Sequence, residues 1–163
     1  MSVLKLIGML LIFASAITTA REYGEYCQRR IRQSSAFRAF VAHLESKAFT
    51  YLLPSSEAVC DFADEELAGV GFIDALREGG SLYSSFSLVK DKLLFSEGQK
   101  AALLSFFKDF GNSYVEDERA RAKKAAQSLE ELGMEDEKKT KESERVVKTL
   151  VLASALGLII LML

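Results

Sequence analysis

The chain has 163 residues, of which 49% are hydrophobic and 27% are charged, with 21 Lys and Arg against 23 Asp and Glu. This length suits one small domain, and the formal net charge of −2 argues against a nucleic-acid-binding protein, which would need a strongly basic surface. The charge is also segregated, because every acidic residue lies between Glu22 and Glu144 and both ends are apolar. This pattern predicts a membrane protein with a soluble middle.

The composition favours helix. The chain has one proline, Pro54, no tryptophan, and many Ala, Leu, Lys and Glu residues, which lose little side-chain entropy in a helix. The sequence shows neither sustained period-two alternation nor an Asn-Gly or Asp-Gly hairpin signal. We therefore expect an all-α protein. Cys27 and Cys60 have neither metal-ligand nor disulfide-framework spacing, so we expect them to be small buried residues in a reducing compartment.

The chain opens with a candidate membrane span. Residues 6–20 are a run of fifteen uncharged residues that follows Lys5. A helix of that length covers roughly 22 Å, against about 30 Å of hydrocarbon, and snorkelling by Lys5 extends it. We predict an N-terminal transmembrane helix over residues 1–20. The alternative is a cleavable signal peptide, with Thr18 and Ala20 ahead of Arg21.

Flanking charge indicates the orientation of both apolar ends. One lysine precedes the first run, whereas five arginines follow it: Arg21, Arg29, Arg30, Arg32 and Arg38. Five basic residues likewise precede the second uncharged run, residues 149–163: Lys138, Lys139, Lys141, Arg145 and Lys148. Because positive charge near a span marks the cytoplasmic side, we expect a two-pass protein with residues 21–148 in the cytosol and both termini outside.

The middle begins with a continuation of the first helix. Residues 34–53 carry apolar residues at gaps of three and four, which predicts a helix with one buried face. Pro54 ends it, because proline lacks the backbone donor and clashes with the preceding turn. The predicted face consists of Phe37, Phe40, Val41, Leu44, Ala48, Tyr51 and Leu52.

Four shorter helices are expected next. The first would begin at an N-cap Ser55 or Ser56 and run through the acidic segment "DFADEE". The second covers residues 71–80 and ends at a glycine pair, the third covers residues 81–94, and the fourth follows an N-cap at Ser96. Each has one apolar face, so together they can form one small core.

The sequence of residues 112–148 predicts a long, charged, solvent-exposed helix. Its apolar stripe is thin, and residues 135–145 are almost entirely polar; the stripe is Val115, Ala122, Ala126, Leu129 and Leu132. Opposite charges four residues apart, such as Glu137 and Lys141, support a helix by about 0.2–0.5 kcal/mol a pair. We expect this helix to continue into the second span, giving about six helices in the soluble part.

The sequence offers no candidate catalytic, cofactor-binding or metal-binding site. Its one histidine, His43, lies among apolar residues, as a packed or surface histidine would. Gly69 and Gly71 are not followed by the Lys-Ser/Thr of a phosphate-binding loop, and "DFADEE" lacks the spacing of a calcium loop. We therefore expect a protein that is not an enzyme and binds no cofactor, small-molecule substrate or nucleic acid.

Short matches in a fixed order carry a resemblance to a known family. They are "RRIRQ" at residues 29–33, "LE" at 44–45, Pro54 with "EA" at 57–58, "FG" at 110–111, and the apolar end "LGLIILML". With this layout the chain resembles the stage III sporulation protein AB family of endospore-forming bacteria over nearly its whole length. It departs from the family pattern at Lys47, at Tyr114-Val115 and at Ala122.

The resemblance implies a cytosolic helical bundle similar to the cytoplasmic domain of the inner-membrane platform protein of type II secretion systems and type IV pili. It implies a non-enzymatic subunit of a secretion-like complex in the mother-cell membrane that faces the forespore. Its partners would be a cytosolic secretion ATPase and other membrane subunits of the complex, which supports a channel between the two cells. The alternative is a membrane-tethered adaptor or regulator unrelated to sporulation.

These expectations give a three-part chain and a candidate docking surface. Residues 1–20 and 149–163 would be the spans, and residues 21–148 the cytosolic bundle. Because the sequence offers no site chemistry, we expect charged residues to dock the partner. Two groups of opposite charge are the candidates: Arg29, Arg30 and Arg32, and Asp64, Glu65 and Glu66.

Overall fold

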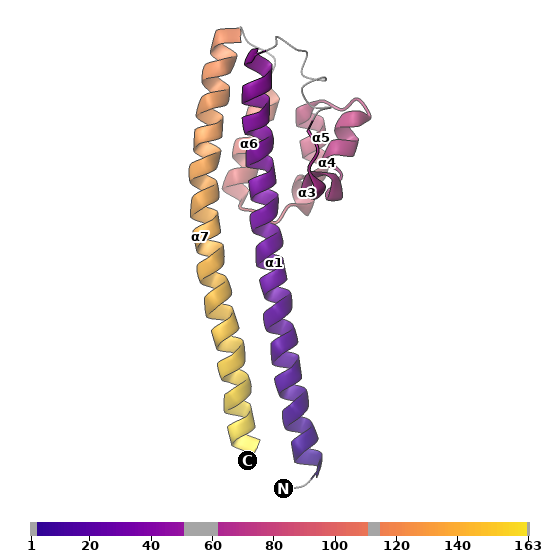
Figure 1. The fold of residues 1–163 in the computed structure, drawn as a ribbon, viewed down its shortest axis with the longest axis vertical. Helices are drawn as coiled ribbons and strands as arrows, with labels where there is room; N and C mark the ends of the chain where they lie inside the picture. The colour runs from indigo at the N-terminus through magenta and orange to yellow at the C-terminus, as the bar shows by residue number, and fades with distance from the viewer. Residues whose placement is uncertain (1–2, 51–61, 111–114, 163) are drawn as a thin grey trace. The chain divides into compact units, whose positions relative to one another are not determined.

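The computed structural model describes residues 3–50, 62–110 and 115–162. Throughout this part of the chain all regular structure is helical, which confirms the all-α prediction (Figure 1). The described residues form two long helices and four short ones. They are α1 (Val3–Thr50), α3 (Glu65–Gly69), α4 (Phe72–Arg77), α5 (Leu82–Val89) with the 3-10 turn η1 (Lys90–Lys92), α6 (Glu97–Asp109) and α7 (Val115–Met162).

The chain divides into two compact units. The central unit is Arg30–Asp136, and the terminal unit combines Met1–Arg29 with Glu137–Leu163. Both boundaries fall inside a long helix, so α1 and α7 each contribute residues to both units. The central unit is continuous in sequence, and it contains the short helices.

The core of the central unit forms around the predicted apolar face of α1. Phe37, Phe40, Val41 and Leu44 are at most 1% exposed. Residues of all the short α-helices pack on this face, among them Leu67, Phe72, Phe86 and Leu103. The other predicted positions of the face, Ala48, Tyr51 and Leu52, and the predicted stop at Pro54, lie outside the described side chains. Where it is described, the predicted face is confirmed.

Phenylalanine rings dominate this core. The ring of Phe40 lies 5.3 Å from those of Phe62 and Phe72 and 6.1 Å from that of Phe107. Phe37 makes comparable contacts with Phe72, at 5.1 Å. Such tilted and edge-to-face pairs add about 0.5–1.5 kcal/mol each beyond the area that they bury. The cluster therefore fixes the short helices against α1.

Helix α7 completes the same core. Ala122 and Leu129, two residues of the stripe predicted to be thin, are 1% and 2% exposed and belong to the buried cluster. Ala126 is partly buried against it. The apolar core thus extends beyond Phe110, and a fragment that ends near residue 111 would lack one of its walls.

The helix ends follow local signals, with one correction. Ser96 and Ser81 cap α6 and α5 through bonds from the backbone N–H of Gln99 and Ser84. The predicted helix from Ser55 or Ser56 through the acidic segment is wrong at residues 62–64, which are not helical, whereas Glu65 and Glu66 are helical as predicted. Asp64 is instead the N-cap of α3; its carboxylate accepts the free N–H groups of the first turn.

Glycine ends α4 as the sequence predicted. The helix stops at Arg77, and Gly79 follows with φ of 90°, a left-handed conformation that residues with a Cβ rarely adopt. At Gly80 a Cβ would lie 2.6 Å from the carbonyl oxygen of Ala75, so only glycine fits this turn. The glycine pair therefore ends α4 and leads the chain into α5.

In the terminal unit, residues of α1 and α7 pair through small or polar side chains. The hydroxyls of Tyr23 and Ser143 are 2.9 Å apart, and a Cβ at Gly24 would lie 2.7 Å from Lys148 Nζ. Small residues are buried here: Ala16, Ala20, Cys27 and Ala155. Large apolar residues are exposed: Leu6, Ile7, Leu10, Leu11, Phe13, Ile17, Leu150, Leu156, Leu158, Ile160 and Leu161. The unit therefore presents its apolar side chains outward.

The structure also bears on the predictions for the two cysteines and for the long charged helix. Cys27 is buried, as predicted for a small core residue, whereas Cys60 lies outside the described residues. Helix α7 runs without a break from the charged segment into the apolar one, as the sequence predicted. Glu137 and Lys141 form the predicted ion pair, with 2.6 Å between Oε1 and Nζ.

Candidate functional site

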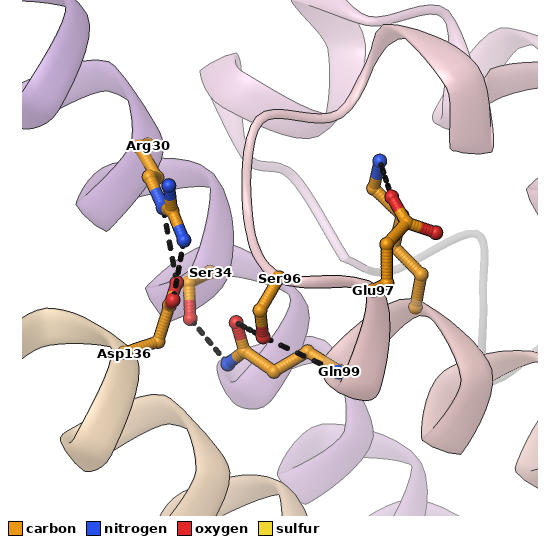
Figure 2. A network of polar contacts seen from close by, with 7 residues as sticks. Arg30, Ser34, Ser96, Glu97, Gln99 and Asp136 are labelled. Carbon is orange, nitrogen blue, oxygen red and sulfur yellow. Dashed lines mark hydrogen bonds and ion pairs between the residues drawn. The ribbon is translucent and has the colours of Figure 1, made fainter. Parts of the chain in front are cut away.

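A partly buried ion pair joins α1 to α7 in the central unit. Arg30 donates from Nε and Nη2 to the two carboxylate oxygens of Asp136, at 3.2 and 2.5 Å (Figure 2). The side chains are 27% and 8% exposed. A two-point bond between a planar guanidinium and a carboxylate fixes orientation as well as distance. The pair therefore holds the two long helices in one register.

The burial of Asp136 corrects a prediction. Residues 135–145 were expected to be solvent-exposed, yet Asp136 and Thr140 are 7% and 5% exposed. A signal was present in the sequence: Leu129, Gly133, Asp136 and Thr140 follow one another at gaps of four, three and four. This is the helical spacing of the stripe that begins at Ala122, continued in small and polar residues.

A second polar contact lies between α1 and the start of α6. Gln99 is 2% exposed, and its side-chain amide donates to the hydroxyl of Ser34 at 2.8 Å. Its backbone N–H donates to Ser96, so the helix cap and the contact with α1 share one residue (Figure 2). Gln33 accepts from the backbone N–H of Leu94 at 3.0 Å. Buried polar groups need such partners, and these bonds position the start of α6.

Three residues of the segment "RRIRQ" therefore bind other parts of the central unit. Arg30 binds α7, Gln33 binds the connection before α6, and Arg32 donates from Nε to Glu66 Oε1 at 2.5 Å. One turn of α1 thus contacts three separated segments. These three side chains therefore link α1 to the rest of the central unit.

The six candidate docking residues have different surroundings. Arg30, Arg32 and Glu66 are in the ion pairs described above, and Asp64 accepts from the backbone N–H groups of Glu66 and Leu67 at 2.9 and 3.0 Å. The two predicted charge groups therefore contact each other between Arg32 and Glu66. Glu65, on α3, and Arg29, in the terminal unit, are exposed.

Across residues 3–50, 62–110 and 115–162 no group of three His, Cys, Asp or Glu side chains could hold a metal ion. His43 packs its ring 5.1 Å from the ring of Phe62. Its position is that of a packed histidine at the edge of the aromatic core.

Comparison with known proteins identifies the family. A family model described as stage III sporulation protein AB matches residues 5–163. The chain belongs to this family. The match covers both units and confirms the resemblance inferred from the sequence. No curated protein and no solved structure matches the chain significantly.

This member of the family carries one candidate membrane helix among its described residues. By length and composition, Lys5–Ser46 in α1 could cross a membrane, and its most apolar stretch has a mean hydropathy of 1.3. Only 6% of that stretch is buried, whereas the core helix of a soluble domain would be mostly buried. The stretch lies near the N-terminus, where the sequence placed the first span.

Proposed function

We propose that this protein is a non-enzymatic, membrane-anchored coupling subunit of the stage III sporulation secretion-like complex. In this role it links a cytosolic secretion ATPase to the channel between mother cell and forespore. The family match over residues 5–163 is the observation that carries the proposal. One unit packed around an aromatic core and another with outward apolar side chains suit a protein that acts by binding.

The terminal unit is proposed to be the membrane anchor, with two spans. The first is the apolar part of α1, and the second is the end of α7, where residues 149–163 carry no charge. Leu150, Leu156 and Ile160 on α7 are 53–68% exposed, an arrangement that suits an apolar surrounding. Small residues between the helices allow the close approach typical of membrane helix pairs.

The central unit is proposed to lie in the cytosol and to dock the partners there. Basic residues adjoin both proposed spans on the side of the central unit, for example Arg21 and Arg145. Of the candidate docking residues, Glu65 and Arg29 are exposed and can meet a partner without loss of the helix cap or of an ion pair described above. Reversal of Asp64, Glu65 and Glu66 together would also damage the fold, so Glu65→Lys alone is the better probe.

The proposal is tested by binding between the full chain in lipid nanodiscs and the purified secretion ATPase of the complex. We expect saturable binding that weakens as salt is raised, because charged rim contacts are screened. Empty nanodiscs are the control. Absence of binding at micromolar concentrations would refute the coupling role and favour the alternative, a membrane-tethered adaptor outside this complex.

A further inference from the structure

The central unit has a groove between α6 and the part of α7 from Arg121 to Ser128. Its volume is about 410 Å³, and its floor is formed by Ala102, Phe106, Phe110 and Ala125. The rings of Phe106 and Phe110 meet edge-on at 5.3 Å, and Phe110 is only partly buried. A volume in this range is that of a binding pocket for a small molecule or a few side chains. The outer end of the aromatic core is therefore open to a partner.

The rim of the groove is charged. Arg121 and Lys124 line it from α7, and Asp109 lines it from α6. The rim thus carries two positive charges against one negative charge. Charge complementarity favours an occupant with more than one carboxylate.

We propose that the groove binds an acidic amphipathic segment of a protein partner. One large apolar side chain of that segment packs against Phe106 and Phe110, and its carboxylates lie against Arg121 and Lys124. The inference rests on the proposed function, under which the segment belongs to the secretion ATPase. A symmetric contact between two copies of the chain would bring two positively charged rims together, which like-charge repulsion opposes.

The apolar floor and the charged rim have different roles in this contact. A buried anchor in a pocket supplies most of the affinity, whereas rim charges set the association rate and the salt dependence. Asp109 lines the groove from α6, across from Arg121 and Lys124. Its negative charge repels a carboxylate of the bound segment on the α6 side, and this repulsion fixes the direction in which the segment lies. The two roles can be tested separately.

Neighbouring residues of α7 provide matched controls. Lys123 and Lys124 are both exposed and adjacent, but only Lys124 lines the groove. Likewise Ser128 lines the groove, whereas the exposed residue before it, Gln127, does not. Lys124→Glu can therefore be compared with Lys123→Glu, and the groove-filling Ser128→Trp with Gln127→Trp. The lysine pair changes charge equally, and the second pair introduces the same tryptophan side chain at two adjacent positions.

The experiment measures the affinity of the full-length variants in nanodiscs for the purified secretion ATPase. We expect Lys124→Glu to weaken binding about tenfold, mainly through a slower association rate, and Lys123→Glu to change it by less than about twofold. Ser128→Trp should weaken binding through faster dissociation, whereas Gln127→Trp should not. Unchanged melting temperatures show that the variants are folded, and if Ser128→Trp does not fold, the lysine pair decides.

The possible failures are distinguishable. If the unmodified chain does not bind the ATPase, the proposed function fails and the groove assignment fails with it. If the unmodified chain binds but the members of each pair behave alike, the groove assignment alone is overturned. A change in the oligomeric state of Lys124→Glu, with ATPase binding unchanged, would also overturn it and would assign the groove to a second copy of the chain.

Discussion

Replacement of Phe40 by alanine tests the core of the central unit. Phe40 is 0% exposed and contacts the rings of Phe62, Phe72 and Phe107. A buried Phe→Ala change costs about 3–5 kcal/mol, from lost burial and from the cavity that remains. A small domain has only about 5–15 kcal/mol of stability, so the change removes a large part of it. Phe40→Ala should therefore bring the unit close to unfolding.

The assay is urea unfolding of a fragment with residues 30–136, which is continuous and contains the buried stripe of α7. With a slope of about 2 kcal/mol/M, Phe40→Ala should lower the midpoint by about 2 M. The control is Leu88→Ala: Leu88 is 71% exposed, and its loss should change stability by less than about 0.5 kcal/mol. A loss below 1 kcal/mol for Phe40→Ala, with an unchanged slope, would show that the aromatic core is wrongly assigned.

Two polar contacts yield further predictions in the same assay. Gln99→Leu leaves the buried Ser34 hydroxyl without its amide partner and should cost about 1–3 kcal/mol; an unchanged midpoint would mean that this contact does not stabilise the fold. Because Arg30 and Asp136 are the end residues of that fragment, their ion pair is tested in a longer one, residues 21–148. There Arg30→Ala and Asp136→Ala should each destabilise the fold, and their double-mutant cycle should give a coupling of about 1–2 kcal/mol, because Arg30 is partly exposed. Fully additive losses would show that the two-point bond contributes nothing.

Helical periodicity made much of the fold predictable. The buried face of α1, the N-cap Ser96 and the end of α4 all depend on residues within a few positions of one another, and the sequence shows those directly. The N-cap of α3 at Asp64 was not predicted, although aspartate is about as good an N-cap as serine and Asp64 directly precedes two acidic residues and an apolar one. The predicted N-cap at Ser55 or Ser56 lies outside the described residues.

The polar contacts were not predicted because they join distant parts of the chain. Arg30 and Asp136 are 106 residues apart, and Ser34 and Gln99 are 65 apart. Periodicity identifies the stripe of a helix that faces the core, but it does not identify the partner of a polar residue in that stripe. The groove beside Lys124 was missed for the same reason, since two helices must come together to form it.

The orientation of the central unit is the central claim, because a cytosolic ATPase can reach it only from the cytosol. Gly98→Cys offers a direct probe: Gly98 is exposed, and a Cβ there meets no atom within 4 Å. The variant would be made with Cys60→Ala, while Cys27, at 1% exposure, stays protected.

The measurement is thiol labelling in intact mother cells, with permeabilised cells as the control for reactivity. We expect a membrane-permeant reagent to label the new cysteine and an impermeant reagent to label it only after permeabilisation. Labelling of intact cells by the impermeant reagent, or a mature protein that begins at Arg21, would contradict the proposed topology.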